Sequence, residues 1–164
     1  MGFFENTRKP QGFGGKIMVK MMNIGHSKLA KWGFTKIYAK SNAKVLDIGC
    51  GGGANIVNWL GKCETGHVTG IDYSKVSVEE SKKLNAMAIN QGKCEIVYGD
   101  VSSMPFDNEA FDCVSAFETV YFWKDLEKCF AEVHRVMKNG GTFLICNESD
   151  GTNFKDEKWA KKIG

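Results

Sequence analysis

The stretch VLDIGCGGGANI, which runs from Val45 to Ile56, decides the fold of this chain. It begins with apolar residues that are typical of a buried strand, continues through a cluster of glycines and ends in a helical pattern. A strand that opens through glycines into a helix usually presents backbone N–H groups to a ligand. Gly49, Gly51 and Ala54 also have the G-x-G-x-x-G/A spacing of a dinucleotide-binding loop. Because several classes of ligand use such loops, other residues must identify the ligand.

The residues on both sides of this loop alternate between strand-like and helical patterns. Strands are predicted at residues 43–49, 67–72, 94–100, 111–117 and 142–148, and helices at 54–61, 74–92 and 125–141. This alternation predicts βαβ units with right-handed crossovers around one parallel sheet.

Short local signals mark the ends of the predicted helices. Ser74 is a candidate N-cap, and Ser77 and Glu80 have the spacing of a capping box. Gly61 is predicted to close the first helix, and Gly140 the third. The third helix is predicted to bury one apolar face, made of Leu126, Phe130, Val133 and Met137.

The composition is that of an ordinary globular domain. The chain has 164 residues, of which 43% are hydrophobic and 25% charged, and this suits one domain with an apolar core. The formal net charge of +3 is too small to indicate nucleic acid or an anionic membrane as a partner. Residues 1–10 lack the apolar run of a secretory signal, and no apolar stretch has the length of a membrane span.

Six cysteines are spread along the chain, at Cys50, Cys63, Cys94, Cys113, Cys129 and Cys146. They form no C-x-x-C pair, and no histidine lies near them at the spacing of a metal ligand, so no metal site is predicted. Reduced thiols in a cytoplasmic protein are the simplest interpretation.

Three carboxylates follow successive predicted strands, at the edge where open parallel sheets bind ligands. Asp47 lies in the approach to the glycine loop, where a carboxylate repels a pyrophosphate and attracts an ammonium or sulfonium group. The alternative is that Asp47 caps amides of the loop. Asp72 ends the second strand and can accept both hydroxyls of a ribose. Asp100 ends the third strand, where a carboxylate beside a free backbone N–H suits the edge of adenine.

The chain resembles the class I S-adenosylmethionine-dependent methyltransferases, in particular the branch that includes quinone-biosynthesis and other small-molecule methyltransferases. The stretches that carry the resemblance are VLDIGCGGGANI, VTGIDYS, VYGDVSSMPF, FDCVSAFETVYFW and EVHRVMKNGGTFLICNE. The resemblance implies an α/β fold with a Rossmann-like, doubly wound sheet in the strand order 3-2-1-4-5. It also implies S-adenosylmethionine as the cofactor and a small molecule as the methyl acceptor.

The resemblance assigns the methionine and ribose parts of the cofactor to the first two motifs. The methionine moiety is assigned to Asp47 and to the backbone of Gly49, Cys50 and Gly51. The Cys50 thiol is expected to be unreactive, because the loop uses the backbone of this residue. The ribose hydroxyls are assigned to Asp72.

The resemblance assigns the adenine to residues that follow the second and third strands. Tyr73 would pack against the ring, Asp100 would take its amino group, and the backbone of Val101 would lie beside it. Phe117, at the end of the fourth strand, would contact the amino-acid end of the cofactor through its carbonyl.

Methyl transfer from a sulfonium is an in-line displacement, which requires alignment and exclusion of water more than a nucleophile or a metal. An acceptor oxygen or carbon must lose a proton, so a general base is useful but not obligatory. The candidate bases are Glu118 and Tyr121, which follow the fourth strand. Tyr121, Phe122 and Trp123 either line an apolar acceptor pocket or pack in the core, and both interpretations stay open. FETVYF lacks the prolines of the motif found in methyltransferases that act on adenine or amide nitrogens.

The predicted organisation has an N-terminal arm and helical lid at residues 1–40 and a cofactor-binding core at residues 41–164. The family sheet normally has seven strands, and the sixth and seventh are not predicted here. The fifth strand is therefore expected to have an exposed apolar edge. Three explanations are open: the chain is truncated, it forms a homo-oligomer or another complex through that edge, or it is a degenerate relative.

Two further functions compete with methyl transfer. A non-catalytic module that binds S-adenosylmethionine or assists assembly is favoured by the short C-terminal part. A NAD-dependent oxidoreductase is suggested by the glycine loop and opposed by Asp47.

Overall fold

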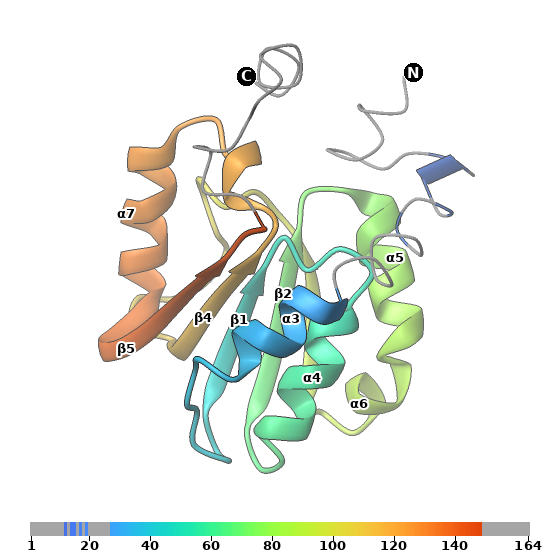
Figure 1. Cartoon of the computed structure of the whole chain (residues 1–164), viewed down its shortest axis with the longest axis horizontal. Coiled ribbons are helices and arrows are strands. Elements are labelled where there is room, and N and C mark those ends of the chain that lie inside the picture. The colour runs from blue at the N-terminus through green and yellow to red at the C-terminus, as the bar shows by residue number, and fades with distance from the viewer. Residues whose placement is uncertain (1–11, 13, 16, 18, 20–26, 149–164) are drawn as a thin grey trace.

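The fold is built on one five-stranded parallel sheet (Figure 1). The computed structural model describes residues 12, 14, 15, 17, 19 and 27–148. The strands are β1 Lys44–Ile48, β2 His67–Asp72, β3 Cys94–Tyr98, β4 Phe111–Phe117 and β5 Met137–Cys146. They lie in the order β3-β2-β1-β4-β5, and every neighbouring pair is parallel. The predicted α/β fold, a Rossmann-like sheet with strand order 3-2-1-4-5, is confirmed.

Helices cover both faces of the sheet. They are α3 Ser27–Phe34, α4 Ala54–Lys62, α5 Lys75–Leu84, α6 Ala86–Asn90, the 3-10 helix η1 Val120–Phe122 and α7 Leu126–Val136. In Figure 1, α3 crosses in front of the strands, α5 and α6 lie on the side of β3, and α7 lies at the opposite side beside β5. Because all five strands are parallel, their carboxyl ends lie along one edge of this layered α/β structure.

Two apolar clusters fill the two faces of the sheet. One joins the sheet to α3 and α4, and it includes Phe34, Val45, Ile56, Trp59 and Val68. The other joins the sheet to α7, and it includes Leu46, Ile71, Val114, Val133 and Val136. Neighbouring residues of β1 alternate between the clusters because successive side chains of a strand point to opposite faces. Each fully buried large aliphatic side chain contributes about 1.5–3 kcal/mol to folding.

The predicted helix at residues 74–92 is two helices. Ser74 is its N-cap as predicted, and its hydroxyl accepts from the amide of Ser77. Ser77 is therefore inside α5, so its predicted capping box with Glu80 is wrong. The break between α5 and α6 falls at Asn85, whose side-chain amide donates to the carbonyl of Gly53 at 3.2 Å. The contact joins Asn85 to a residue of the glycine loop that is distant in the sequence.

Two other helix ends differ from their predictions. Gly61 lies inside α4, which continues to Lys62. The helix expected at residues 125–141 ends at Val136, because β5 begins directly at Met137 and Gly140 lies inside that strand with φ of +76°. The predicted apolar face is also only half right, because Leu126 is 49% exposed whereas Val133 is buried.

α3 packs tightly against the sheet, although residues 1–40 are predicted to be an arm and lid. A Cβ at Gly33 would lie 2.8 Å from the Cys146 Sγ and 2.9 Å from the Phe117 ring. Most of the predicted arm lies outside the described residues, as do residues 149–164, so the division at residue 40 stays a prediction. Within the described part of the chain, no helix combines the length and apolar character needed to cross a membrane.

Candidate functional site: a cofactor cradle at the carboxyl edge of the sheet

The glycine loop after β1 is fixed by backbone hydrogen bonds. The amides of Gly49 and Cys50 both donate to the Ile71 carbonyl of β2, at 2.8 and 3.1 Å. Gly49, Gly51 and Gly53 have φ values of +69°, +53° and +81°, in the left-handed region that glycine adopts readily. The loop therefore turns sharply from the end of β1 into the start of α4.

The glycines of this loop differ in what surrounds them. A Cβ at Gly49 would lie 2.5 Å from the Thr119 Oγ1, and one at Gly53 would lie 2.4 Å from the Asn85 Nδ2. A Cβ at Gly51 would meet no heavy atom within 4 Å. The loop is thus packed at its two ends and open over its centre, where a ligand has room.

Asp72, at the end of β2, ties two loops together. Its Oδ2 accepts from the Gly51 amide at 2.9 Å, and its Oδ1 accepts from the Ser74 amide at 2.8 Å. Burial raises the pKa of this carboxyl, and the two backbone hydrogen bonds counteract part of that rise. Each carboxylate oxygen has a second lone pair, so the side chain can still accept from a ribose hydroxyl. Its predicted ribose contact stays a prediction.

Asp47 lies in β1, next to the last residue of the strand, and is 2% exposed. Its Oδ1 accepts a 2.6 Å hydrogen bond from the hydroxyl of Ser115 on β4. Burial raises the pKa of Asp47 to about 7; the Ser115 hydrogen bond works against this rise, and the charge of Asp72 adds to it. The loop amides of Gly49 and Cys50 donate to a β2 carbonyl instead, so they are not capped by Asp47. The predicted contact of Asp47 with the methionine moiety stays a prediction.

Asp100 follows β3 and is exposed. Its Oδ1 accepts from both the amide and the hydroxyl of Ser102, at 2.8 and 2.7 Å. These hydrogen bonds lower its pKa, so the carboxylate is ionised and able to accept a further hydrogen bond at neutral pH. Val101, the next residue in the sequence, is half-buried. Tyr73, which follows the end of β2, is also half-buried. The adenine contacts assigned to all three stay predictions.

The cysteines take no part in this cradle. All six are buried and free. Burial and the nearby carboxylates of Asp72 and Asp47 raise the pKa of the Cys50 thiol well above its usual range. The thiol is therefore protonated at neutral pH, and the backbone of Cys50 is the part that shapes the loop.

Glu118 and Tyr121, the candidate bases, contact each other beyond the end of β4. The Tyr121 hydroxyl donates to the Glu118 Oε2 at 3.0 Å, and the Glu148 amide donates to the Oε1. Burial and the Glu118 charge raise the pKa of Tyr121 above its ordinary value, so this phenol stays protonated and cannot be a base near neutral pH. Glu118 has φ of +55°, an uncommon backbone conformation for a non-glycine residue, which it shares with Glu109. The structure thus favours Glu118 over Tyr121 as the base.

The aromatic residues after β4 divide between the two interpretations that the sequence leaves open. The Trp123 ring packs edge-on against Phe130 of α7, with centroids 5.6 Å apart, and its indole N–H donates to the Thr119 hydroxyl. Trp123 is therefore part of the core. Tyr121 is 38% exposed and contacts Phe122, with ring centroids 4.5 Å apart. These two rings are available to an apolar acceptor.

Phe117, the last residue of β4, has its side chain in the core. Its ring stacks on Phe34 of α3, with centroids 5.2 Å apart. The predicted contact with the cofactor involves its carbonyl, so the buried ring is compatible with that role, which stays a prediction.

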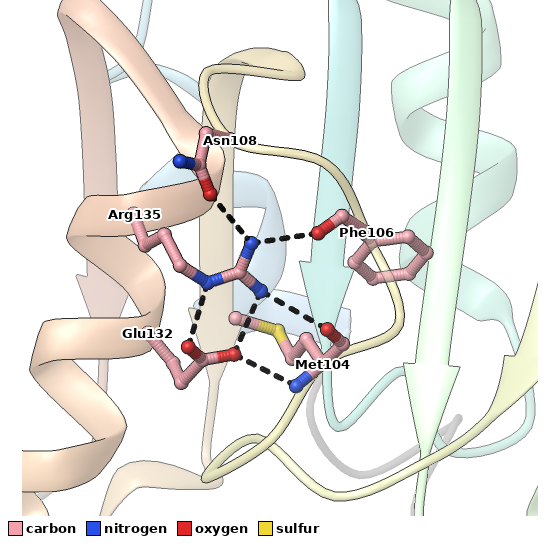
Figure 2. Close-up of polar contacts among 5 residues, drawn as sticks. All are labelled: Met104, Phe106, Asn108, Glu132 and Arg135. Atoms are coloured by element: carbon pink, nitrogen blue, oxygen red, sulfur yellow. Dashed lines mark hydrogen bonds and ion pairs between the residues drawn. The ribbon is translucent and has the colours of Figure 1, made fainter.

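Sequence reasoning missed a clamp that holds the segment after Asp100 against α7 (Figure 2). The Arg135 guanidinium donates to Glu132, to the carbonyls of Met104 and Phe106 and to the Asn108 side chain, at 2.7 to 3.0 Å. Glu132 in turn accepts from the Met104 amide at 2.8 Å. The i,i+3 spacing of Glu132 and Arg135 was the available signal, but it indicates only a helix surface pair.

The carboxylates at this edge of the sheet suit S-adenosylmethionine as a ligand. The Gly51 position has open space and its amide binds Asp72, and Asp47 lies close enough to Asp72 for their charges to interact; the two carboxylates can attract a cation and accept from hydroxyls. Residues 46–145 match the family described as "Methyltransferase domain", which is most of the chain, and the chain therefore belongs to that family. The predicted recognition of a methyltransferase with S-adenosylmethionine as its cofactor is confirmed at this level.

Relatives among characterised proteins carry the names of sterol methyltransferases. The chain is 35% identical over 106 residues to a cycloartenol-C-24-methyltransferase of Oryza sativa subsp. japonica, covering 65% of this chain and 30% of that protein. It is 29% identical over 136 residues to a sterol 24-C-methyltransferase of Neurospora crassa, covering 79% and 36%. The chain thus spans about a third of the length of these relatives.

Solved structures show the same fold. A Haloferax volcanii methyltransferase, solved in complex with the Trm112 methyltransferase activator, has a TM-score of 0.72 and 25% identity, covering 77% of this chain and 54% of that one. The geranyl diphosphate C-methyltransferase of Streptomyces coelicolor A3(2), solved with S-adenosyl-L-homocysteine, has a TM-score of 0.67 and 20% identity, covering 74% and 43%. At these identities the likeness supports the Rossmann-like architecture.

Proposed function

We propose that this chain transfers the methyl group of S-adenosylmethionine to a small, largely apolar acceptor. The observation that carries the proposal is the cradle at the carboxyl ends of β1 and β2, where Asp72 accepts from the Gly51 amide at the open centre of the glycine loop and Asp47 lies close enough to Asp72 for their charges to interact. The sterol and isoprenoid names of the relatives support an apolar acceptor, as does the exposed ring of Tyr121 after β4. The quinone-biosynthesis branch stays a second source of acceptors of the same character.

The residues of the cradle would hold the cofactor in parts. Asp47 would attract the ammonium of its methionine end, and Asp72 would accept from the ribose hydroxyls. Asp100, with Tyr73 and Val101, would hold the adenine. When bound, the cofactor supplies an activated methyl group, so the chain has mainly to align the acceptor and exclude water.

Glu118 would act on the acceptor side. Attack by a carbon or oxygen of the acceptor forms its new bond to the methyl carbon, and the electrons of the broken sulfur–carbon bond return to sulfur. The acceptor must then lose a proton, which Glu118 can take. Its carboxylate sits beyond the end of β4, held by the Tyr121 hydroxyl and the Glu148 amide. Its neighbour Thr119 contacts the glycine loop at Gly49.

The acceptor class, partners and location belong to the same proposal. The free edge of β5 is an edge of the described sheet and offers unpaired backbone groups to a second copy of this chain. The small net charge supports neither nucleic acid nor a membrane as partner. The six free thiols suit a reducing compartment such as the cytoplasm.

Calorimetry and a transfer assay test the proposal together. The chain should bind S-adenosylhomocysteine and not NAD, and it should move labelled methyl from S-adenosylmethionine to members of a panel of sterols, isoprenoids and quinols. Glu118→Gln should keep binding and lose transfer, whereas Asp72→Asn should weaken binding. Binding without transfer to any acceptor would favour the non-catalytic module, and binding of NAD alone would favour an oxidoreductase.

A further inference from the structure

We propose that Trp59 and Ser115 are positioning residues for the cofactor, because they form a buried relay that orients Asp47 toward the ammonium end of S-adenosylmethionine. This inference rests on the proposed function and assigns a role to two residues to which the resemblance assigns none. Neither residue belongs to the glycine loop: Trp59 lies in α4 and Ser115 in β4.

The three side chains form one continuous chain of hydrogen bonds. The Trp59 indole N–H donates to the Ser115 Oγ at 2.9 Å, and the Ser115 hydroxyl donates to the Asp47 Oδ1 at 2.6 Å. Trp59 and Ser115 are fully buried, and Asp47 nearly so. Asp47 and Ser115 are direct partners in the register of β1 and β4, so the sheet itself sets the spacing of their side chains.

The chemistry of the groups fixes the direction of the relay. An indole N–H can only donate, so it occupies a lone pair of the Ser115 oxygen. The hydroxyl hydrogen is then free to point to Asp47, and an ionised carboxylate can only accept. Both hydrogen bonds are satisfied together when Asp47 is ionised, with one of its oxygens fixed in place. The relay therefore favours one orientation and one charge of this carboxylate.

No cation among the described residues compensates the charge of Asp47. The ion pairs in the described part of the chain join Lys83 to Glu80, Arg135 to Glu132 and Lys138 to Asp112. The titratable groups next to Asp47 are Asp72 at the end of β2, which repels its charge, and the protonated thiol of Cys50 in the loop. An ionised carboxylate buried in this way is stabilised strongly by a cation that arrives with a ligand.

The proton balance of Asp47 gives the relay a measurable signature. With a pKa of about 7, Asp47 is partly protonated at neutral pH, and binding of a cationic methionine end favours the ionised form. Affinity for an amino-acid-bearing ligand should therefore rise with pH through about 7. Loss of the Ser115 hydroxyl removes the hydrogen bond that lowers this pKa, so the rise should move to higher pH.

Calorimetric titration of the full chain with two ligands separates the relay from general damage. S-adenosylhomocysteine carries the ammonium, and 5′-methylthioadenosine has the same nucleoside without it. If loss of the hydroxyl raises the pKa of Asp47 by about one unit, Ser115→Ala should weaken the binding of S-adenosylhomocysteine about fivefold at neutral pH, because the ionised fraction of Asp47 falls from about one half to about one eleventh. The effect should be much smaller at about pH 8.5. Binding of 5′-methylthioadenosine should change less than about twofold at either pH.

Two further variants keep the test sharp. Trp59→Phe keeps an aromatic ring and removes the donor, so it should produce a smaller shift of the same sign. Thr69→Val is the matched control, because Thr69 is a buried hydroxyl on the neighbouring β2 that contacts His67 and not Asp47. It should leave the pH profile unchanged.

Each outcome decides between the two levels of the proposal. A wild-type chain that ignores S-adenosylhomocysteine overturns the proposed function. A wild-type chain that binds it, together with a Ser115→Ala profile that matches the wild type, overturns the relay alone. Equal losses for the two ligands in Ser115→Ala and Trp59→Phe would also overturn it, because they would show a packing role.

Discussion

The two halves of the carboxyl edge of the sheet are built in different ways. In the cofactor half, after β1 to β3, carboxylates accept from backbone amides, as Asp72 does from Gly51 and Ser74. In the acceptor half, after β4 and β5, Glu118 accepts from one backbone amide, of Glu148, and from one side chain, the half-exposed Tyr121. In the cofactor half, the Asp72 carboxylate has little freedom to reorient, because the same hydrogen bonds also fix the backbone of the loop.

This difference separates a general task from a specific one. The cofactor half has to fit one ligand, and its glycines accept almost no added atoms at Gly49 and Gly53. The acceptor half has the exposed ring of Tyr121 and a Glu118 with positive φ. Substitutions in the two halves should therefore differ in size and in kind.

The largest effect is expected from Gly53→Ala. The new Cβ would lie 2.4 Å from both the Ser81 Oγ and the Asn85 Nδ2, at a φ of +81°. Overpacking together with backbone strain should lower the free energy of unfolding by about 3 kcal/mol and disrupt cofactor binding. Denaturant titration measures the loss. Gly61→Ala is the matched control, because it lies in α4 with open space around it and should stabilise by up to about 1 kcal/mol. Equal results for both glycines would contradict the rigid packing of the cofactor half.

Arg135→Ala should have the next largest effect, because it removes the clamp between α7 and residues 104–108. Loss of hydrogen bonds to a charged group should lower the free energy of unfolding by about 2 kcal/mol at neutral pH. Arg135→Lys should rescue little, since an ammonium lacks the planar fork. Lys138→Ala, which breaks the more exposed pair with Asp112, should cost less than about 1 kcal/mol.

The Arg135 effect should also depend on pH. The hydrogen bonds from Arg135 lower the pKa of Glu132 to about 2 from a usual value of 4.5. A carboxyl with a lowered pKa contributes stability that is complete above the higher value and disappears as pH falls through the lower one. The stability difference between the wild type and Arg135→Ala should therefore narrow between about pH 4.5 and 2, and a constant difference would contradict the assignment.

Asp47→Asn should weaken cofactor binding and increase the folding stability of the free protein. The folded pKa of about 7 lies above the usual 3.8, so the ionisation of Asp47 reduces the stability of the free protein as pH rises between these values. The neutral amide should make the free protein more stable than the wild type above neutral pH, by about 1 kcal/mol or more. The same substitution should also weaken the binding of S-adenosylhomocysteine. Thermal unfolding at two pH values checks the first effect, and a variant that is less stable at both would refute it.

The amino-acid sequence predicted most of the cofactor half because its signals are local. The bounds of β2 and β4 agree with the predictions at both ends: β2 begins after Gly66 and ends at Asp72, and β4 ends at Phe117, directly before Glu118 with its positive φ. Ser74 was recognised as an N-cap for the same reason. The tight turns at Gly49 and Gly51 likewise require a residue that adopts positive φ.

The errors arise where a distant contact decides the structure. The break after α5 depends on the Asn85 amide reaching Gly53, which no local pattern reveals. The end of α7 depends on Met137 pairing with Phe111 of β4. The relay to Asp47 needs Trp59 and Ser115 to meet across α4 and β4. In the acceptor half, the sequence identified Glu118 and Tyr121 as candidate bases but did not reveal the hydrogen bond from the Tyr121 hydroxyl to Glu118.

The smallest effect on stability is expected from Tyr121→Phe, and it tests the acceptor half directly. Tyr121 is 38% exposed and donates one hydrogen bond to Glu118, so its loss should lower the free energy of unfolding by less than about 1 kcal/mol. S-adenosylhomocysteine affinity should stay the same, because among the described residues the Tyr121 hydroxyl hydrogen-bonds to Glu118 and not to the cofactor half. The released Glu118 can then adopt other orientations, so kcat should fall while KM for the cofactor does not change. If Tyr121→Phe instead weakened cofactor binding, the two halves would not be independent, and the contact between Gly49 and Thr119 would be the route of that coupling.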